Sequence, residues 1–69
     1  MQNWEHCLLF PYNNAWRAVY YTSTASLIFA EANSFEEGMQ KLVGGGWEMV
    51  TVYPNGSDLY YAFKRPAQE

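Results

Sequence analysis

The chain has 69 residues, 49% hydrophobic and 16% charged side chains, and a formal net charge of −3 at pH 7. This length fits one small domain, residues 1–69, and excludes a second. Four basic against seven acidic side chains also argue against a duplex nucleic-acid partner, because affinity for duplexes comes mainly from Lys and Arg on phosphates. No apolar run approaches the roughly 20 residues that span a bilayer, and no basic run precedes an apolar stretch at the N-terminus, so we expect a cytoplasmic chain without membrane contact.

The sequence contains neither of the usual covalent or metal supports of a very small domain. Its single cysteine cannot form an internal disulfide, and one cysteine with one histidine cannot make a tetrahedral zinc site of thiolates and imidazoles. We therefore expect no cofactor, and we expect a partner subunit to contribute stability instead.

The N-terminal part of the chain predicts a β-hairpin. Residues 4–10 are rich in aromatic and aliphatic side chains and are closed by Pro11, which is typical of a strand. Residues 11–14 (Pro-Tyr-Asn-Asn) predict a turn, because asparagine tolerates left-handed backbone angles. Residues 16–22 then predict a second strand, antiparallel to the first.

The middle of the chain predicts one helix. Residues 27–31 fit either a short third strand or the start of a longer helix, and we favour the strand. Ser34 and Glu37 have the spacing of a capping box, in which the hydroxyl accepts from the Glu37 amide and the carboxylate accepts from the cap amide. An apolar stripe at helical spacing predicts a helix over residues 35–43. The stripe consists of Phe35, Met39, Leu42 and Val43.

Glycines 44–46 predict the end of this helix, since glycine readily adopts the left-handed conformation at its C-terminus. Residues 47–53 and 59–65 predict two more strands, joined by a tight turn that contains Gly56. Simple alternation places Trp47, Met49 and Tyr53 on one face and Glu48, Val50 and Val52 on the other. The expected fold class is α+β, an antiparallel sheet of four to five strands with one helix packed on one face.

Bulky side chains occupy both faces of the predicted strands, whereas a short helix covers only part of one face. Large exposed apolar surfaces usually mark interfaces, so we expect a homo-oligomer. In the pairs Tyr20-Tyr21 and Tyr60-Tyr61 one ring is expected in the core and the other at an interface. Trp47, which follows the glycines, is expected to be structural and to pack against Met39 or Val43.

Three segments resemble a known family. They are residues 4–5 (WE), residues 46–50 (GWEMV) and residues 60–66 (YYAFKRP). In this order, with an acidic amphipathic helix before the Gly-Trp, they are similar to the GWELV…YxFKRP pattern of small bacterial and viral proteins catalogued as domain of unknown function 4177. The chain departs from the pattern at residues 6–7 (His-Cys), where Tyr-Lys is usual, and at residues 44–45 (Gly-Gly), where Ala or Glu is common. The resemblance implies the fold and little more.

Catalytic interpretations find little support in the sequence. His6 and Cys7 are neighbours on a strand and point to opposite faces, so they cannot form a nucleophile pair within one chain. We expect Cys7 to be a small buried hydrophobe and His6 an edge or interface residue. Glycines 44–46 leave a helix instead of entering one, which argues against a phosphate-binding loop. Strand-end and turn positions explain Glu48 and Asp58, and we expect no enzyme.

The basic residues Arg17, Lys64 and Arg65 have two interpretations. We favour charged strand ends, which discourage edge-to-edge aggregation. The other interpretation joins them to aromatic rings in a site for a small anionic ligand, since rings stack on bases and guanidinium groups hold phosphates. The candidate ligand-binding residues are Trp16, Arg17, Tyr20, Tyr60, Lys64 and Arg65.

The function that we expect from the sequence is a non-enzymatic small binding module that self-associates, with a protein or a small anionic ligand as a further partner. The alternative is a viral-type sequestering protein that captures a nucleotide second messenger at a subunit interface.

Overall fold

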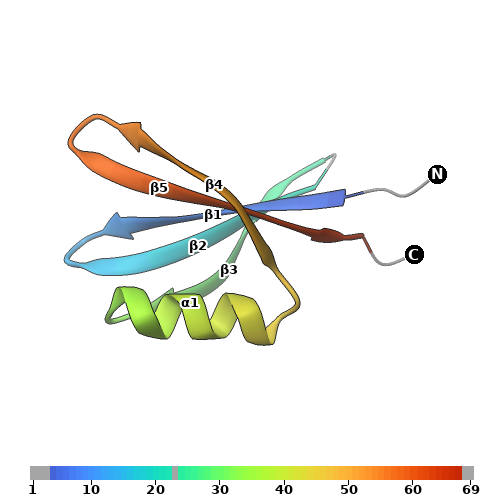
Figure 1. Cartoon of the computed structure of the whole chain (residues 1–69), viewed down its shortest axis with the longest axis horizontal. Coiled ribbons are helices and arrows are strands. Elements are labelled where there is room, and N and C mark those ends of the chain that lie inside the picture. The colour runs from blue at the N-terminus through green and yellow to red at the C-terminus, as the bar shows by residue number, and fades with distance from the viewer. Residues whose placement is uncertain (1–3, 23, 68–69) are drawn as a thin grey trace.

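The computed structural model describes residues 4–22 and 24–67 and contains five strands and one helix. In chain order the elements are β1 (Trp4–Tyr12), β2 (Ala15–Tyr21), β3 (Ser26–Ala32), α1 (Phe35–Gly44), β4 (Glu48–Asn55) and β5 (Asp58–Pro66). All neighbouring strands are antiparallel, in the order β3-β2-β1-β5-β4, and α1 lies on one face of the sheet (Figure 1). The expected α+β fold is confirmed, and the segment after residue 25 is a strand.

The first hairpin is longer than the sequence suggested. Pro11 does not close β1 but lies within it, opposite Trp16 of β2. The pairing of β1 with β5 extends only as far as Leu9, so Pro11 has a neighbouring strand on one side only, where a sheet tolerates proline. Asn13 and Asn14 then turn the chain with φ angles of 51° and 61°, as expected for a tight hairpin turn whose twist matches that of the strands.

Each of the two edge strands contains a β-bulge. The register shifts in β3 at Phe29 and in β4 at Val50. The extra residue in β4 reverses the phase of alternation, so that Met49 and Val52 lie opposite Phe63 and Tyr61 of β5 on the face that α1 covers. The sequence-based grouping of Val52 with Glu48 is therefore wrong, because simple alternation takes no account of an inserted residue.

The phase change also corrects the expected position of Tyr53. Tyr53 pairs with Tyr60, on the face away from α1, and does not share a face with Met49. The turn between β4 and β5 is tight, as expected, and Asn55 pairs directly with Asp58. Its Gly56 has a φ of 67°, a conformation that favours glycine.

Side chains at the start of α1 accept hydrogen bonds from two backbone amides, one within the helix and one just before it. The Ser34 hydroxyl accepts a hydrogen bond of 3.2 Å from the Glu37 amide, as the capping box predicts. The Glu37 carboxylate, however, accepts from the amide of Asn33, at 3.3 Å, and not from that of Ser34. The carboxylate half of the expected capping box thus binds the amide one residue earlier than predicted. Both hydrogen bonds still fix the chain where it enters the helix.

Two glycines, one within α1 and one just after it, stand where a larger residue would clash or be strained. Gly38 is buried against β1, and a Cβ there would lie 3.1 Å from a methyl carbon of Leu9. Gly46 has a φ of 86°, which lets the chain reverse from the helix toward β4. The Trp47 amide then donates to the Leu42 carbonyl at 3.0 Å, so the reversal also satisfies the end of the helix.

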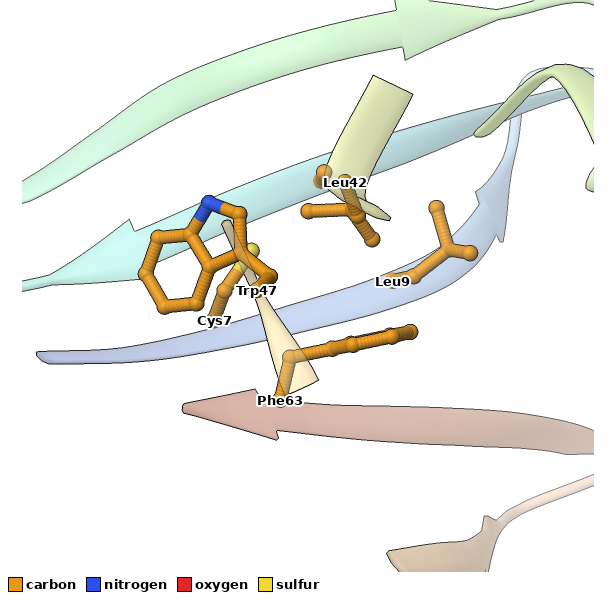
Figure 2. Close-up of a cluster of buried hydrophobic side chains, with 6 residues drawn as sticks. Cys7, Leu9, Leu42, Trp47 and Phe63 are labelled. Carbon is orange, nitrogen blue, oxygen red and sulfur yellow. The ribbon is translucent and has the colours of Figure 1, made fainter. Parts of the chain in front are cut away.

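The core lies between α1 and the sheet, around Trp47. Trp47 is 3% exposed, and its ring meets the rings of Tyr20 and Phe29 with centroid distances of 6.3 and 5.9 Å. Figure 2 shows Leu42 from α1 above Cys7 and Leu9 of β1. The cluster of buried residues is Cys7, Leu9, Ala18, Leu42, Trp47 and Phe63. A structural position for Trp47 is confirmed. Of its two expected neighbours, Met39 packs against this cluster, whereas Val43 is 62% exposed.

We expect Trp47→Ala to lower the free energy of unfolding by about 3–5 kcal/mol, because it removes the largest ring of the core and leaves a cavity. For so small a domain a loss of this size is comparable to the whole stability. The matched control is Val43→Ala in the same region, for which we expect a change within about 0.5 kcal/mol. Chemical denaturation followed by circular dichroism measures both, and equal effects of the two substitutions would contradict the assignment.

Candidate functional site

The face of the sheet opposite α1, here called the open face, has no covering element within residues 4–22 and 24–67 (Figure 1). Strand pairing and alternation identify its members. Its exposed large hydrophobic residues are Trp4, Tyr12, Tyr21, Ile28 and Tyr53. Its half-buried hydrophobic residues are Leu8, Phe10, Val19 and Tyr60. The open face is therefore an apolar and strongly aromatic surface formed by all five strands.

Three rings form a row across β1, β5 and β4 on this face. Phe10 and Tyr60 stack with centroids 4.9 Å apart and planes 9° from parallel, and Tyr53 follows with its centroid 5.9 Å from that of Tyr60. Because the facing planes of Phe10 and Tyr60 already cover one another, a base cannot insert between these two rings without displacing them. Phe10 and Tyr53 were not among the candidates from sequence, since only the register of the strands shows that they flank Tyr60.

The arginine and the lysine of the open face, Arg17 and Lys64, both contact side chains of the same chain. Arg17 donates two hydrogen bonds to one carboxylate oxygen of Glu31, at 2.7 and 3.0 Å, and its guanidinium lies 4.0 Å from the ring centroid of Tyr12. The hydrogen bond to Glu31 raises the pKa of Arg17 above its ordinary value. The ammonium of Lys64 lies 4.3 Å from the ring centroid of Trp4. Both cations thus contact aromatic faces that a ligand would otherwise stack on.

The structure divides the six candidate ligand-binding residues between two faces. Tyr60, Arg17 and Lys64 lie on the open face. The other three, Trp16, Tyr20 and Arg65, lie on the α1 side, where Trp16 packs edge-on against Phe35 with centroids 5.2 Å apart. The expected grouping of the three basic residues is therefore not formed within one chain, because Lys64 and Arg65 are consecutive in a strand and point in opposite directions.

Arg65 holds the end of α1 against the sheet. Its Nε donates to a carboxylate oxygen of Glu5 at 2.9 Å, and its Nη1 donates to the Gly45 carbonyl at 3.0 Å. The guanidinium also lies 4.3 Å from the ring centroid of Trp47. A planar fork that binds a carboxylate and a carbonyl while stacking on an indole is a geometry that lysine cannot reproduce.

We expect Arg65→Lys to lower the free energy of unfolding by about 1–2 kcal/mol, because it removes the hydrogen bond to Gly45 and the stacking on Trp47. The control is Arg17→Lys, whose partner Glu31 is well exposed, and there we expect less than about 1 kcal/mol. Thermal and urea unfolding distinguish the two. A larger loss for Arg17→Lys than for Arg65→Lys would show that Arg65 does not have this structural role.

His6 and Cys7 lie on opposite faces of β1, as expected. Cys7 is fully buried under α1, whereas His6 is exposed on the open face opposite Lys64. Burial raises the pKa of the Cys7 thiol to about 12, and the charge of Arg65 opposes this shift in part. A thiol in this state is neither a nucleophile nor an exposed ligand at neutral pH, so Cys7 is a structural residue.

We expect Cys7 to react with a thiol reagent at pH 8 at least about a hundredfold more slowly in the folded chain than in denaturant, because burial excludes the reagent and keeps the thiol protonated. The same shift makes stability fall as the pH rises above about 9, since the unfolded thiol then ionises while the folded one does not. Absorbance-monitored labelling with and without denaturant measures the ratio. Equal rates would mean that Cys7 is accessible.

Lys41, the remaining cation, is also engaged. Its Nζ lies 3.4 Å from a carboxylate oxygen of Glu37, the pairing expected along the helix, and donates to the Glu31 carbonyl at 2.8 Å. An anionic ligand would thus compete with an existing contact at every Lys and Arg of the chain.

Comparisons with known proteins identify no relative: no family model, no curated protein and no solved structure matches the chain. The resemblance to the family catalogued as domain of unknown function 4177 therefore remains a hypothesis. Among the residues that the structure describes, none belongs to a helix long and apolar enough to cross a bilayer. Within that same part of the chain no three His, Cys, Asp or Glu residues are grouped to hold a metal ion.

Proposed function

We propose that this protein is a non-enzymatic binding module that self-associates. The observation that carries the proposal is the open face, on which large apolar side chains from β1, β2, β3 and β4 stay exposed and Tyr60 of β5 is half-buried. A contiguous apolar surface of more than a few hundred Å² on a small protein usually marks an interface. Burial of such a surface is the main favourable term in most protein association.

The small size of the core supports the same proposal. Seven of the described hydrophobic residues are buried, all in the layer between α1 and the sheet or at its margin. A chain of this length buries only about 60% of the surface that it exposes when unfolded. A second copy that covers the remaining apolar surface would add the stability that neither a disulfide nor a metal supplies here.

The alternative, capture of a nucleotide second messenger between subunits, has weaker support. Arg17 and Arg65 already bind the carboxylates of Glu31 and Glu5, so a phosphate would have to displace a carboxylate at either position. The aromatic residues on the open face still leave this alternative testable. A thermal-shift panel of cyclic and linear nucleotides tests it, because a ligand present at a hundred times its Kd and bound only by the folded state adds about 2.7 kcal/mol of stability.

We expect light scattering at micromolar concentration to give a mass of at least twice 8.0 kDa, and we expect the melting temperature to rise with protein concentration. A monomer that melts cooperatively at a temperature independent of concentration would contradict self-association. A stabilising nucleotide, together with a change in mass on binding, would instead favour the sequestering protein.

A further inference from the structure

We propose that the open face is the surface through which two copies of this chain associate, packed face to face about a two-fold axis. This inference rests on the proposed self-association and adds the location of the interface. The occupant is a second copy of the chain, and three features of the open face point to it: an apolar centre, cations that already have contacts within their own subunit, and an area of suitable size.

The centre of the open face is apolar across four adjacent strands. The register aligns Ile28 of β3 with Val19 of β2, Val19 with Leu8 of β1, and Leu8 with Ala62 of β5. This row contains no charged side chain, and the ring row that begins at Phe10 lies beside it. An apolar centre with polar groups around it is the usual arrangement of a protein interface.

The charges on the open face suit contact with an identical surface. Arg17 is bound to Glu31, and Lys64 lies opposite Glu48 in the register of β4 and β5. Arg17 is thus paired with an anion and the ammonium of Lys64 lies over the Trp4 ring of its own subunit, so a second copy does not have to supply a counter-charge for either cation. A partner of strong net charge, such as a nucleic acid, gains no comparable match from this surface.

The area of the open face approaches that of a standard dimer interface. Five strands at about 4.8 Å spacing, with about seven residues at about 3.3 Å rise, give a face of roughly 24 by 23 Å, or about 550 Å² in projection. The accessible area of side chains that stand up from a sheet is larger than this projection. It therefore approaches the roughly 800 Å² per partner of a standard interface.

The edges of the sheet are less suited to association than its open face. β3 and β4, the two edge strands, each contain a bulge, and a bulge interrupts the regular row of free backbone groups that a further strand would need. On the α1 side, Met49, Val52 and Leu59 are exposed beside the helix. These residues lie on β4 and its neighbour β5 and give a narrower apolar strip than the open face.

The test compares two matched substitutions on edge strands, Ile28→Lys on the open face and Val52→Lys on the α1 side. The two side chains are 55% and 45% exposed, so neither substitution should unfold a single subunit. We expect Ile28→Lys to raise the dimer Kd at least tenfold in sedimentation equilibrium, because the two-fold axis buries two copies of the new charge. We expect Val52→Lys to leave the Kd within about twofold of the wild type. Circular dichroism checks folding, and Tyr53→Lys replaces Ile28→Lys if that variant is unfolded.

Unchanged dimers in the open-face variant would overturn this location of the interface and leave self-association itself intact. Dissociation by Val52→Lys but not by Ile28→Lys would place the interface on the α1 side and would also overturn it. A wild-type chain that is monomeric at every concentration would remove the proposed function and this inference together.

Discussion

A ten-residue helix cannot cover a five-stranded sheet, and this mismatch in size determines where the core lies and which surfaces stay exposed. Such a helix is about 15 Å long and about 10 Å wide, whereas the sheet is roughly 24 Å across. α1 packs mainly against β2 and β3, so it covers one part of one face. The core is consequently one-sided, β4 remains exposed along its whole length, and the opposite face has no cover among the described residues.

Because the core is one-sided, its closure at the end of α1 is decisive for stability. Trp47 fills the space where the chain leaves the helix. Arg65 from β5 fixes the C-terminal end of α1 to the sheet by binding both Glu5 and the Gly45 carbonyl. Phe29, the bulged residue of β3, completes the group by meeting Trp47 edge-on. Four segments that are distant in sequence thus meet in this aromatic cluster. The guanidinium of Arg65 joins three of them, because from β5 it binds Glu5 and Gly45 and stacks on Trp47. The indole Nε1 of Trp47 is buried without a hydrogen-bond partner among the described residues, and nothing in the structure explains this.

Local signals in the sequence predicted the elements of the fold well, because each rests on neighbouring residues. The Ser34 cap, the glycines after the helix and the asparagine turn are of this kind, and all three are confirmed.

The faces of β4 were not predictable from sequence, since the extra residue Val50 reverses the alternation and only the pairing with β5 reveals it. The distribution of the candidate site residues over two faces was missed for a related reason: Arg65 was grouped with Lys64 by its position in sequence, although alternation places the two side chains on opposite faces of β5. The ring row of Phe10, Tyr60 and Tyr53 needed the register of three strands.

The bulges at Phe29 and Val50 have a consequence for the chain at high concentration. A sheet with two regular edges can recruit further strands without limit, and the product of such growth is a fibre. Here both edges carry an irregularity, so growth in the hydrogen-bonding direction is interrupted on each side of the molecule. A contact between two open faces, by contrast, buries the surface that forms it, so that assembly stops at a fixed number of copies. In the proposed self-association, the two inserted residues thus favour a closed particle over a filament.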